Sequence, residues 1–254
     1  MEYIILFVSA LPVFFINKYV YNKDRDKEPK KLLEKLTIGG VASCFLVLII
    51  SSILSSMFPI FAVEDYESLT SFELAIKVFI GIALVEEFCK YLFVYRFSYN
   101  QKEFDYIFDM VVYAVYVSLG FALFENILYV MSGGIGVGII RAFTAIPMHA
   151  SAGVMMGHFL GEAKYNELNK KSGTSYKILA LLVPTLIHGA YDYSAFKDNW
   201  SLLLIILVVF VIFSVLIVNH KSRNDVRVAK CENCPRCGTK IIGKFCVKCG
   251  LKIE

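Results

Sequence analysis

Apolar residues run through this chain in stretches of about 20, the length that a helix needs to cross a ~30 Å hydrocarbon core. Short polar segments separate these stretches, and the glycine-rich segment at residues 132–138 has the composition of a flexible turn. The expected fold class is therefore an all-α polytopic membrane protein. The pattern predicts about seven transmembrane helices, near residues 3–21, 36–63, 72–97, 106–131, 137–162, 176–196 and 200–218.

Basic residues follow the first, third, fifth and seventh predicted spans, whereas the connections on the other side contain almost no lysine or arginine. The positive-inside rule therefore predicts a multi-pass protein of the cell membrane, with the N-terminus outside and the C-terminal tail in the cytoplasm. In this orientation Asp109 lies near the cytoplasmic entry of its span, where a solvated or helix-capping role is as well supported as a role at the site.

The composition excludes two broad classes of protein. Hydrophobic residues make up 57% of the 254 residues, which is more than a soluble globular domain contains. Lysine and arginine lie in short loops and in the tail without interleaved aromatic residues, so no nucleic-acid partner is expected. The lipid bilayer is the expected surrounding of most of the chain.

The third predicted span carries three charged residues near its middle: Glu86, Glu87 and Lys90. Insertion scales put the cost of a charge at the bilayer centre at about 2.5–3.5 kcal/mol, so such residues have a role. Lys90 lies one helical turn after the two glutamates and can contact each of them. Two interpretations follow, a structural ion pair or a proton-handling site for catalysis or ion coupling. The extra acid favours the second, because an ion pair needs only one.

Polar residues also interrupt three later apolar segments. His188 and Asp192 are four residues apart and share a helix face, where the carboxylate can orient the imidazole. His188 then suits a metal ligand, a general base, an electrophile or a plain helix–helix hydrogen bond. His149 lies mid-way along its span, and Glu125 precedes Asn126, an amide that can orient it. Because these side chains do not tolerate lipid, we expect them to converge at one site.

Two CxxC motifs in the tail predict a metal site. Cys234 and Cys237 form the first motif, Cys246 and Cys249 form the second, and a glycine follows each. Four thiolates at this spacing predict one structural Zn²⁺ in a small zinc ribbon, which has too little core to fold without the metal. Cys231 is interpreted as a spare or alternate ligand. Reduced thiols agree with the cytoplasmic side.

These features divide the chain into three parts. Residues 1–218 form the membrane core, residues 219–230 a polar linker, and residues 231–254 the zinc ribbon. We expect the linker to make few contacts with the membrane helices.

Four motifs of the membrane core stand in a characteristic order and spacing. They are VEEFCK at residues 85–90, FDYIFDMVVYAVYVSLGFALFENILY at 104–129, PMHASAGVMMG at 147–157 and IHGAYD at 187–192. Together they resemble the PrsW family of intramembrane proteases, which is related to the CAAX-processing and bacteriocin-immunity proteases. The resemblance implies an endopeptidase that cuts a membrane-protein substrate. In the family this substrate is an anti-sigma factor, cut on its extracytoplasmic side in the first step of regulated proteolysis.

The resemblance also implies roles for the buried polar residues. One of Glu86 and Glu87 would activate water as a general base, while the other, with Lys90, would hold charge and donate protons. His149 or His188 would polarise the scissile carbonyl or stabilise the oxyanion. Two glutamates and two histidines also suit catalytic zinc, so a metal-dependent and a metal-free mechanism stay open. The candidate catalytic residues are Glu86, Glu87, Lys90, Glu125, Asn126, His149, His188 and Asp192.

Two functions of other classes remain as alternatives. An ion-coupled transporter would use the buried acids, but no second half repeats the charged span as an inverted repeat would. A non-catalytic membrane scaffold or sensor would act through its zinc ribbon, and its buried acids would matter for stability alone.

Overall fold

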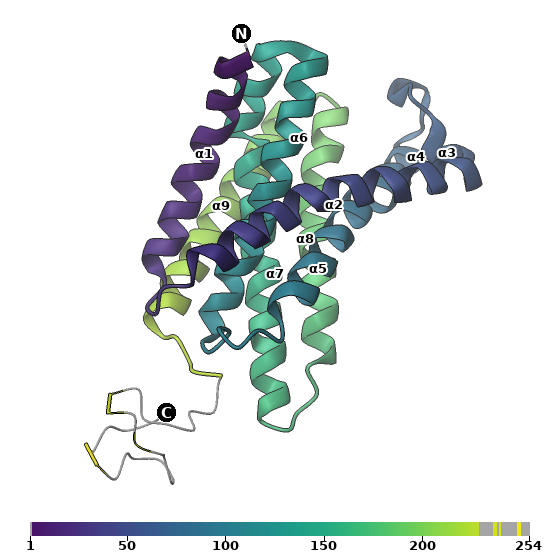
Figure 1. Cartoon of the computed structure of the whole chain (residues 1–254). Coiled ribbons are helices and arrows are strands. Elements are labelled where there is room, and N and C mark those ends of the chain that lie inside the picture. Colours follow the sequence, from purple (N-terminus) through teal and green to yellow (C-terminus); the bar gives the residue numbers. More distant parts are fainter. Residues whose placement is uncertain (1, 229–235, 238, 240–247, 250–254) are drawn as a thin grey trace.

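The computed structural model describes residues 2–228 and, in the tail, residues 236, 237, 239, 248 and 249 (Figure 1). The predicted zinc ribbon depends on Cys234 and Cys246, which lie outside the described residues, as does Cys231.

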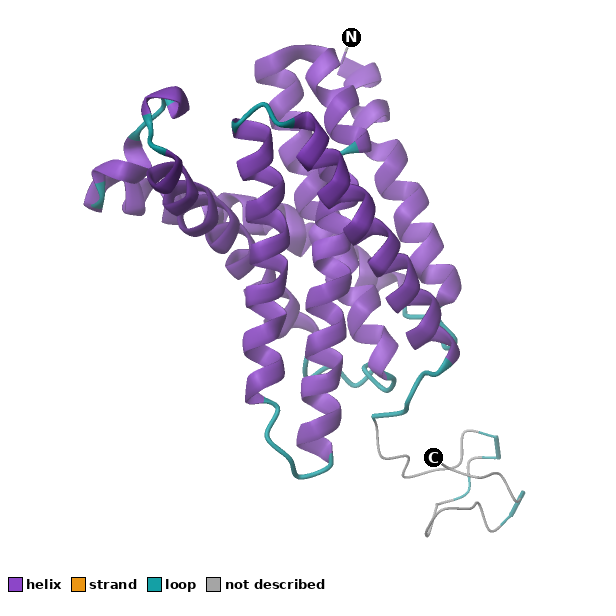
Figure 2. Cartoon of the chain, turned by 180° about the vertical axis from the view of Figure 1, so that it is seen from behind, coloured by secondary structure: helices purple, strands orange, loops and turns teal. Residues whose placement is uncertain are grey.

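Helices account for all the regular elements of the described residues, as Figure 2 shows, so the all-α prediction is confirmed. In chain order they are α1 (Glu2–Lys23), α2 (Lys30–Met57), α3 (Pro59–Ala62), η1 (Tyr66–Ser68), α4 (Ser71–Ile76), η2 (Lys77–Leu84), α5 (Val85–Ser98), α6 (Ile107–Phe143), α7 (Ala145–Leu168), α8 (Thr174–Phe196) and α9 (Trp200–Arg223). By length and composition, α2, α6 and α9 are apolar enough to cross a membrane.

Helix α6 is the centre of the molecule, and α1, α2 and α7 pack directly against it (Figure 1). Glycines let the neighbouring backbones approach closely. A Cβ on Gly40 of α2 would lie 2.0 Å from the carbonyl oxygen of Val117, and one on Gly157 of α7 would lie 2.5 Å from that of Met110. Such contacts are typical of tightly packed membrane helices, which gain stability from close packing.

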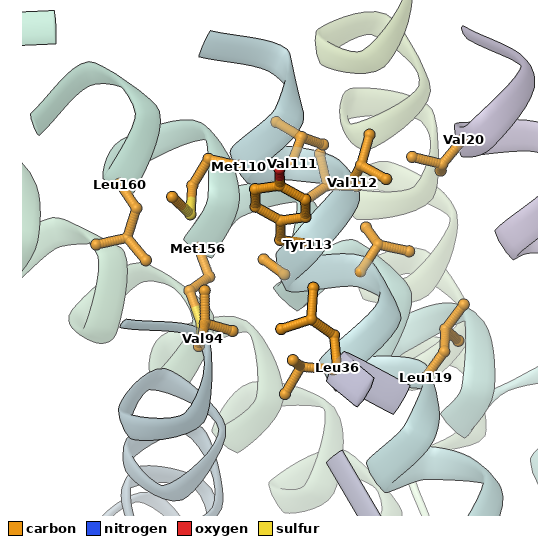
Figure 3. Packing of buried hydrophobic residues seen from close by; sticks show 14 of the residues in the cluster. Val20, Leu36, Val94, Met110, Val111, Val112, Tyr113, Leu119, Met156 and Leu160 are labelled. Atoms are coloured by element: carbon orange, nitrogen blue, oxygen red, sulfur yellow. The ribbon is translucent and has the colours of Figure 1, made fainter. Parts of the chain in front are cut away.

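The main hydrophobic core surrounds the first half of α6. Figure 3 shows Met110, Tyr113 and Leu119 of α6 among side chains of α1, α2, α5 and α7. The outer helices instead expose apolar side chains, for example Ile205 of α9, which is 61% exposed. Charged residues that are buried inside, such as Glu87 and Lys90, together with an apolar exterior are the arrangement expected in lipid.

A reversal inside α6 is more compact than the predicted flexible turn. The chain reverses at Gly134 alone, whose φ of 84° is in the region that favours glycine. The segment after it packs back on α6, so that a Cβ on Gly138 would lie 2.2 Å from the side chain of Val130. A second break occurs at Thr144, because the ring of Pro147 would clash with the carbonyl of residue 143 in a continuous helix.

The predicted second span is also interrupted. Helix α2 ends at Met57, Pro59 opens the short helix α3, and this region extends away from the other helices (Figure 1). Proline fits the first turn of a helix but not its interior, which explains the break.

The linker after α9 contacts the start of α6, contrary to the expectation of few contacts. Asp225 accepts a hydrogen bond from the backbone N–H of Phe108 (3.0 Å), and Val226 accepts one from that of Ile107 (2.9 Å). Arg227 forms an ion pair with Asp105 (3.1 Å). Residues 225–228 therefore belong structurally to the membrane core.

Candidate active site

A continuous helical stretch, α4–η2–α5, carries the charged motif of the third predicted span. It begins with a capping box, in which Thr70 and Glu73 each accept a hydrogen bond from the other's backbone N–H. Its middle part, η2, is a π-helix that ends at Leu84, two residues before Glu86. A π-helix is wider than an α-helix and is often found at functional sites, because it redirects the side chains that follow it.

Lys90 lies between the two glutamates, as the spacing predicted. Its Nζ is 2.8 Å from Glu87 Oε1 and 3.6 Å from Glu86 Oε2. The ammonium group also lies 4.0 Å from the ring centre of Phe121 and 3.0 Å from Nδ1 of His149. Lys90 and Glu87 are fully buried, so their ion pair has no contact with solvent.

Helix α8 brings His188 to the same cluster. Its Nδ1 lies 2.9 Å from Glu87 Oε1, and its Nε2 lies 3.1 Å from Asp192 Oδ2 and 3.7 Å from Glu86 Oε2. Gly189 allows this approach, because a Cβ there would lie 2.4 Å from the ring of Phe79 in η2. Since both nitrogens of His188 face carboxylates, the imidazole can donate from each of them.

Helices α6 and α7 complete the cluster from the other side. His149 of α7 contacts Glu125 Oε2 through Nε2 (3.0 Å), and Arg141 contacts the same oxygen (2.6 Å). A lysine ammonium has no acceptor, so the contact with Lys90 makes Nδ1 of His149 the acceptor and Nε2 the donor to Glu125. The rings of His149 and His188 lie edge to face with centres 4.9 Å apart.

A small cavity of about 70 Å³ opens beside this cluster. Glu86, Glu125, His149, His188 and Asp192 line it, whereas Glu87 and Lys90 lie behind its wall. The cavity is large enough for a few water molecules. Glu86 is the acid of the EE pair that borders this space, whereas Oε2 is buried without a hydrogen-bond partner in both Glu86 and Glu87 in the described part of the chain. The structure thus separates two glutamates that the sequence leaves equivalent.

The structure assigns one predicted residue to a different place and adds others. Asn126 does not line the cavity; its Nδ2 donates to the carbonyl of Gly138 (3.4 Å) across the reversal at Gly134. Arg141 does line it, although it is not among the residues predicted from the sequence. The sequence did contain one signal for Arg141: Glu125 lies in an apolar segment and has no basic residue one helical turn away. The aromatic side chains lining the cavity are Tyr66, Tyr129, Tyr191 and Phe196.

A metal ion could be held by three of these residues. Glu86, His149 and His188 each offer one ligand atom, and the three atoms lie within 4.8 Å of one another. Two imidazoles and a carboxylate are a known ligand set of catalytic zinc, and the unpartnered Oε2 of Glu86 suits it. The donor types therefore fit a metal, which would replace the contacts of Lys90 and Asp192 with the imidazoles.

Comparisons with known proteins agree with this chemistry. The model of the PrsW-protease family, described as PrsW family intramembrane metalloprotease, matches residues 28–218. Protease PrsW of Oceanobacillus iheyensis is 35% identical over 220 residues, which cover 86% of this chain and 94% of the relative. Protease PrsW of Bacillus subtilis is 30% identical over 208 residues, covering 81% and 89%. No solved structure matches the chain.

The family match covers the helices that carry the whole cluster, and the relatives are matched over most of their own length. It favours the protease over the transporter and scaffold alternatives. The chain belongs to the PrsW family of intramembrane proteases, and it is a membrane protease.

Proposed function

We propose that this protein cleaves a peptide bond of a membrane-protein substrate with Glu86 as the general base. The observation that supports this role is the position of Glu86, which borders the cavity, whereas Glu87 does not. A water in the cavity would lose its proton to Glu86 as its oxygen attacks the scissile carbonyl carbon. Glu86 would then return the proton to the leaving amide nitrogen.

Glu87 and Lys90 act from behind the cavity wall in this mechanism. Glu87 holds both Lys90 and His188, at 2.8 and 2.9 Å from one oxygen. Lys90 supplies positive charge close to Glu86, which stabilises the ionised base. This division of roles places proton transfer on Glu86 and positioning on Glu87.

The two histidines and Arg141 are the proposed electrophilic groups. His149, His188 and Arg141 line the cavity, and each carries an N–H donor that a buried carboxylate holds. Donors held in place by buried carboxylates can stabilise the oxyanion that forms on the attacked carbonyl. Asp192 and Glu125 hold His188 and His149 respectively, so we assign them positioning roles.

The family description includes a metal, and Glu86, His149 and His188 are the residues that would hold it. When bound, such a metal would polarise the scissile carbonyl and lower the pKa of a bound water. Chelation of the purified protein, followed by a cleavage assay, separates the two mechanisms: the metal-free one keeps its activity.

The proposed substrate is a membrane protein with a single span, similar to the anti-sigma factors of the family. Support comes from the depth of the cluster. The predicted topology has about seven spans and a cytoplasmic C-terminus, and it puts the cluster between the midplane and the outer face of the cell membrane. In Figure 1 the α1–α2, α5–α6 and α7–α8 connections and the end of α9 lie at one end of the molecule, which fits a common cytoplasmic side for their basic residues.

The tail is proposed to be a zinc ribbon with a structural role. Cys234, Cys237, Cys246 and Cys249 would bind one Zn²⁺, as the two CxxC motifs indicate. All the proposed catalytic groups precede the tail, so it is expected to affect regulation or partner choice. Zinc content of the isolated tail tests this part.

Co-expression with candidate single-span proteins tests the proposed function. Wild type should release a shortened substrate fragment, and Glu86→Gln should not, at equal amounts of enzyme in the membrane. Reporter fusions that place the α7–α8 loop outside would contradict the topology.

A further inference from the structure

A second group of buried acids lies outside the candidate active site. Asp24 and Glu28 come from the α1–α2 connection, and Asp109 is the third residue of α6. One carboxylate oxygen of each lies within 4.8 Å of the others, and the three residues are only 3%, 4% and 0% exposed. We call these three residues the acidic cluster. Along α6 it is roughly 24 Å from Glu125, at about 1.5 Å per residue, so it is separate from the cavity.

Neutral donors hold one oxygen of each carboxylate in place. Asp109 Oδ2 accepts from the backbone N–H of Tyr106 (2.7 Å), Glu28 Oε2 accepts from the hydroxyl of Tyr113 (2.6 Å), and Asp24 Oδ2 accepts from the backbone N–H of Glu28 (3.3 Å). These bonds fix the positions of the carboxylates but bring no positive charge.

Two carboxylate oxygens of the acidic cluster have no partner. Oδ1 of Asp24 and Oδ1 of Asp109 are buried and accept no hydrogen bond within the described residues. A buried oxygen without a partner costs about 1–3 kcal/mol, more when it is charged, so native structures rarely leave one without a ligand. This observation is independent of the clustering, and it points to a group that binds oxygen.

The nearby cations have other partners. The ammonium of Lys27 donates to backbone carbonyls, and Arg227 pairs with Asp105. No lysine or arginine in the described ranges forms an ion pair with the acidic cluster.

We propose that Asp24, Glu28 and Asp109 bind one hard divalent cation, of the class of Mg²⁺, Ca²⁺ and Mn²⁺. These cations take oxygen ligands, and carboxylates supply both the ligand atoms and the compensating charge. The site contains no imidazole or thiolate, so it disfavours softer metals. It is therefore chemically different from the cluster of Glu86, His149 and His188.

A cation at this site would link separate parts of the fold. It joins the α1–α2 connection to the first turn of α6, where the linker after α9 also attaches through Asp225 and Phe108. The second oxygen of Asp225, Oδ2, is likewise buried without a partner. A bound cation would hold the start of α6, the α1–α2 connection and the root of the tail together.

Binding of Mn²⁺ to the full-length protein in detergent tests the proposal. Loss of the free-ion electron paramagnetic resonance signal measures bound Mn²⁺, with zinc present to occupy the thiolates of the tail. We expect one bound Mn²⁺ per chain, displaced by Mg²⁺ or Ca²⁺. A wild-type protein that binds no Mn²⁺ would overturn the proposal and leave a shared proton as the occupant.

Matched variants locate the bound ion. Glu28→Gln and Asp109→Asn should lose it, whereas Glu86→Gln in the other cluster should keep it. Asp24→Asn keeps the acceptor for the backbone N–H of Glu28, so it decides the matter if Asp109→Asn does not fold. Mn²⁺ binding that survives Asp24→Asn and Glu28→Gln, or that is lost only with Glu86→Gln, refutes the site.

Discussion

The two groups of buried acids in this protein differ in how their charge is compensated. In the candidate active site Glu87 is paired with Lys90, and Glu125 with Arg141, at 2.8 and 2.6 Å. In the acidic cluster three carboxylates meet without any such cation among the described residues. Burial is similar in both, so the difference lies in the partners.

The presence or absence of a paired cation determines how each group of acids behaves. Fixed cations make the first group a closed network, in which Glu87 and Glu125 are each paired while Glu86 faces the cavity. Without fixed cations, the second group is stable only with an added proton or metal ion. Removing one partner of a buried ion pair in the active site should therefore lower the stability, whereas neutralising one acid of the acidic cluster should raise it.

The largest effect is expected from breaking the buried ion pair of the active site. Lys90→Met should destabilise the protein by about 3–5 kcal/mol, because Glu87 would stay buried without its cation. Cleavage should be lost as well. Thermal unfolding in detergent and the amount of protein in the membrane measure the first effect.

The double variant Glu87→Gln/Lys90→Met separates stability from function. Removing both charges should restore most of the folded protein but not the cleavage. Full recovery of cleavage in the double variant would mean that the pair serves stability alone.

The acidic cluster should respond in the opposite direction. In chelator, Asp109→Asn should raise the stability on the order of 1 kcal/mol, because it removes one of three like charges and one pKa unit corresponds to about 1.4 kcal/mol. Addition of Mn²⁺ should cancel this gain by stabilising only the wild type. Thermal unfolding with and without Mn²⁺ gives both numbers, and a variant less stable than wild type in chelator would contradict the comparison.

Arg141 connects charge compensation with catalysis. Arg141→Met should lower kcat by about 10²–10³-fold, the range for loss of one donor to the oxyanion, and leave KM nearly unchanged. Arg141→Lys should recover part of the loss, since it retains the positive charge beside Glu125. Equal losses in both variants would assign Arg141 to geometry and not to charge.

The smallest effect concerns the tail. Truncation after Lys230 should leave stability and cleavage of an overexpressed substrate unchanged. Truncation after Arg223 also removes the bond from Phe108 to Asp225 and should cost about 1 kcal/mol. Comparison of the two truncated proteins by thermal unfolding checks this, and equal stabilities would mean that the contacts of residues 225–228 contribute nothing.

Local patterns in the sequence predicted the helices and much of the active site. The spacing of Glu86, Glu87 and Lys90 gives their mutual contacts directly, because residues three and four apart share a helix face. His188 and Asp192 follow the same rule. The convergence of helices was inferred from the cost of polar groups in lipid, which is a general constraint.

Long-range partners could not be predicted in this way. Arg141 reaches Glu125 because the chain reverses at Gly134, and a glycine-rich segment does not reveal which of its residues turns. Asp109 meets Asp24 and Glu28 through tertiary packing of α1, α2 and α6. The periodicity of the sequence within one helix does not predict such contacts. The unequal positions of Glu86 and Glu87 also depend on where the cavity forms.

The most direct test of the account is cleavage by the purified protein with one glutamate changed at a time. Glu86→Gln should lower the rate by about 10²–10⁴-fold while the protein remains folded, because it removes only the proposed base. The matched control is Glu167→Gln. Glu167 of α7 pairs with Lys177 at a distance of 2.6 Å and does not line the cavity, so this variant should cleave like wild type. Cleavage by Glu86→Gln at the rate of the control would contradict the central claim.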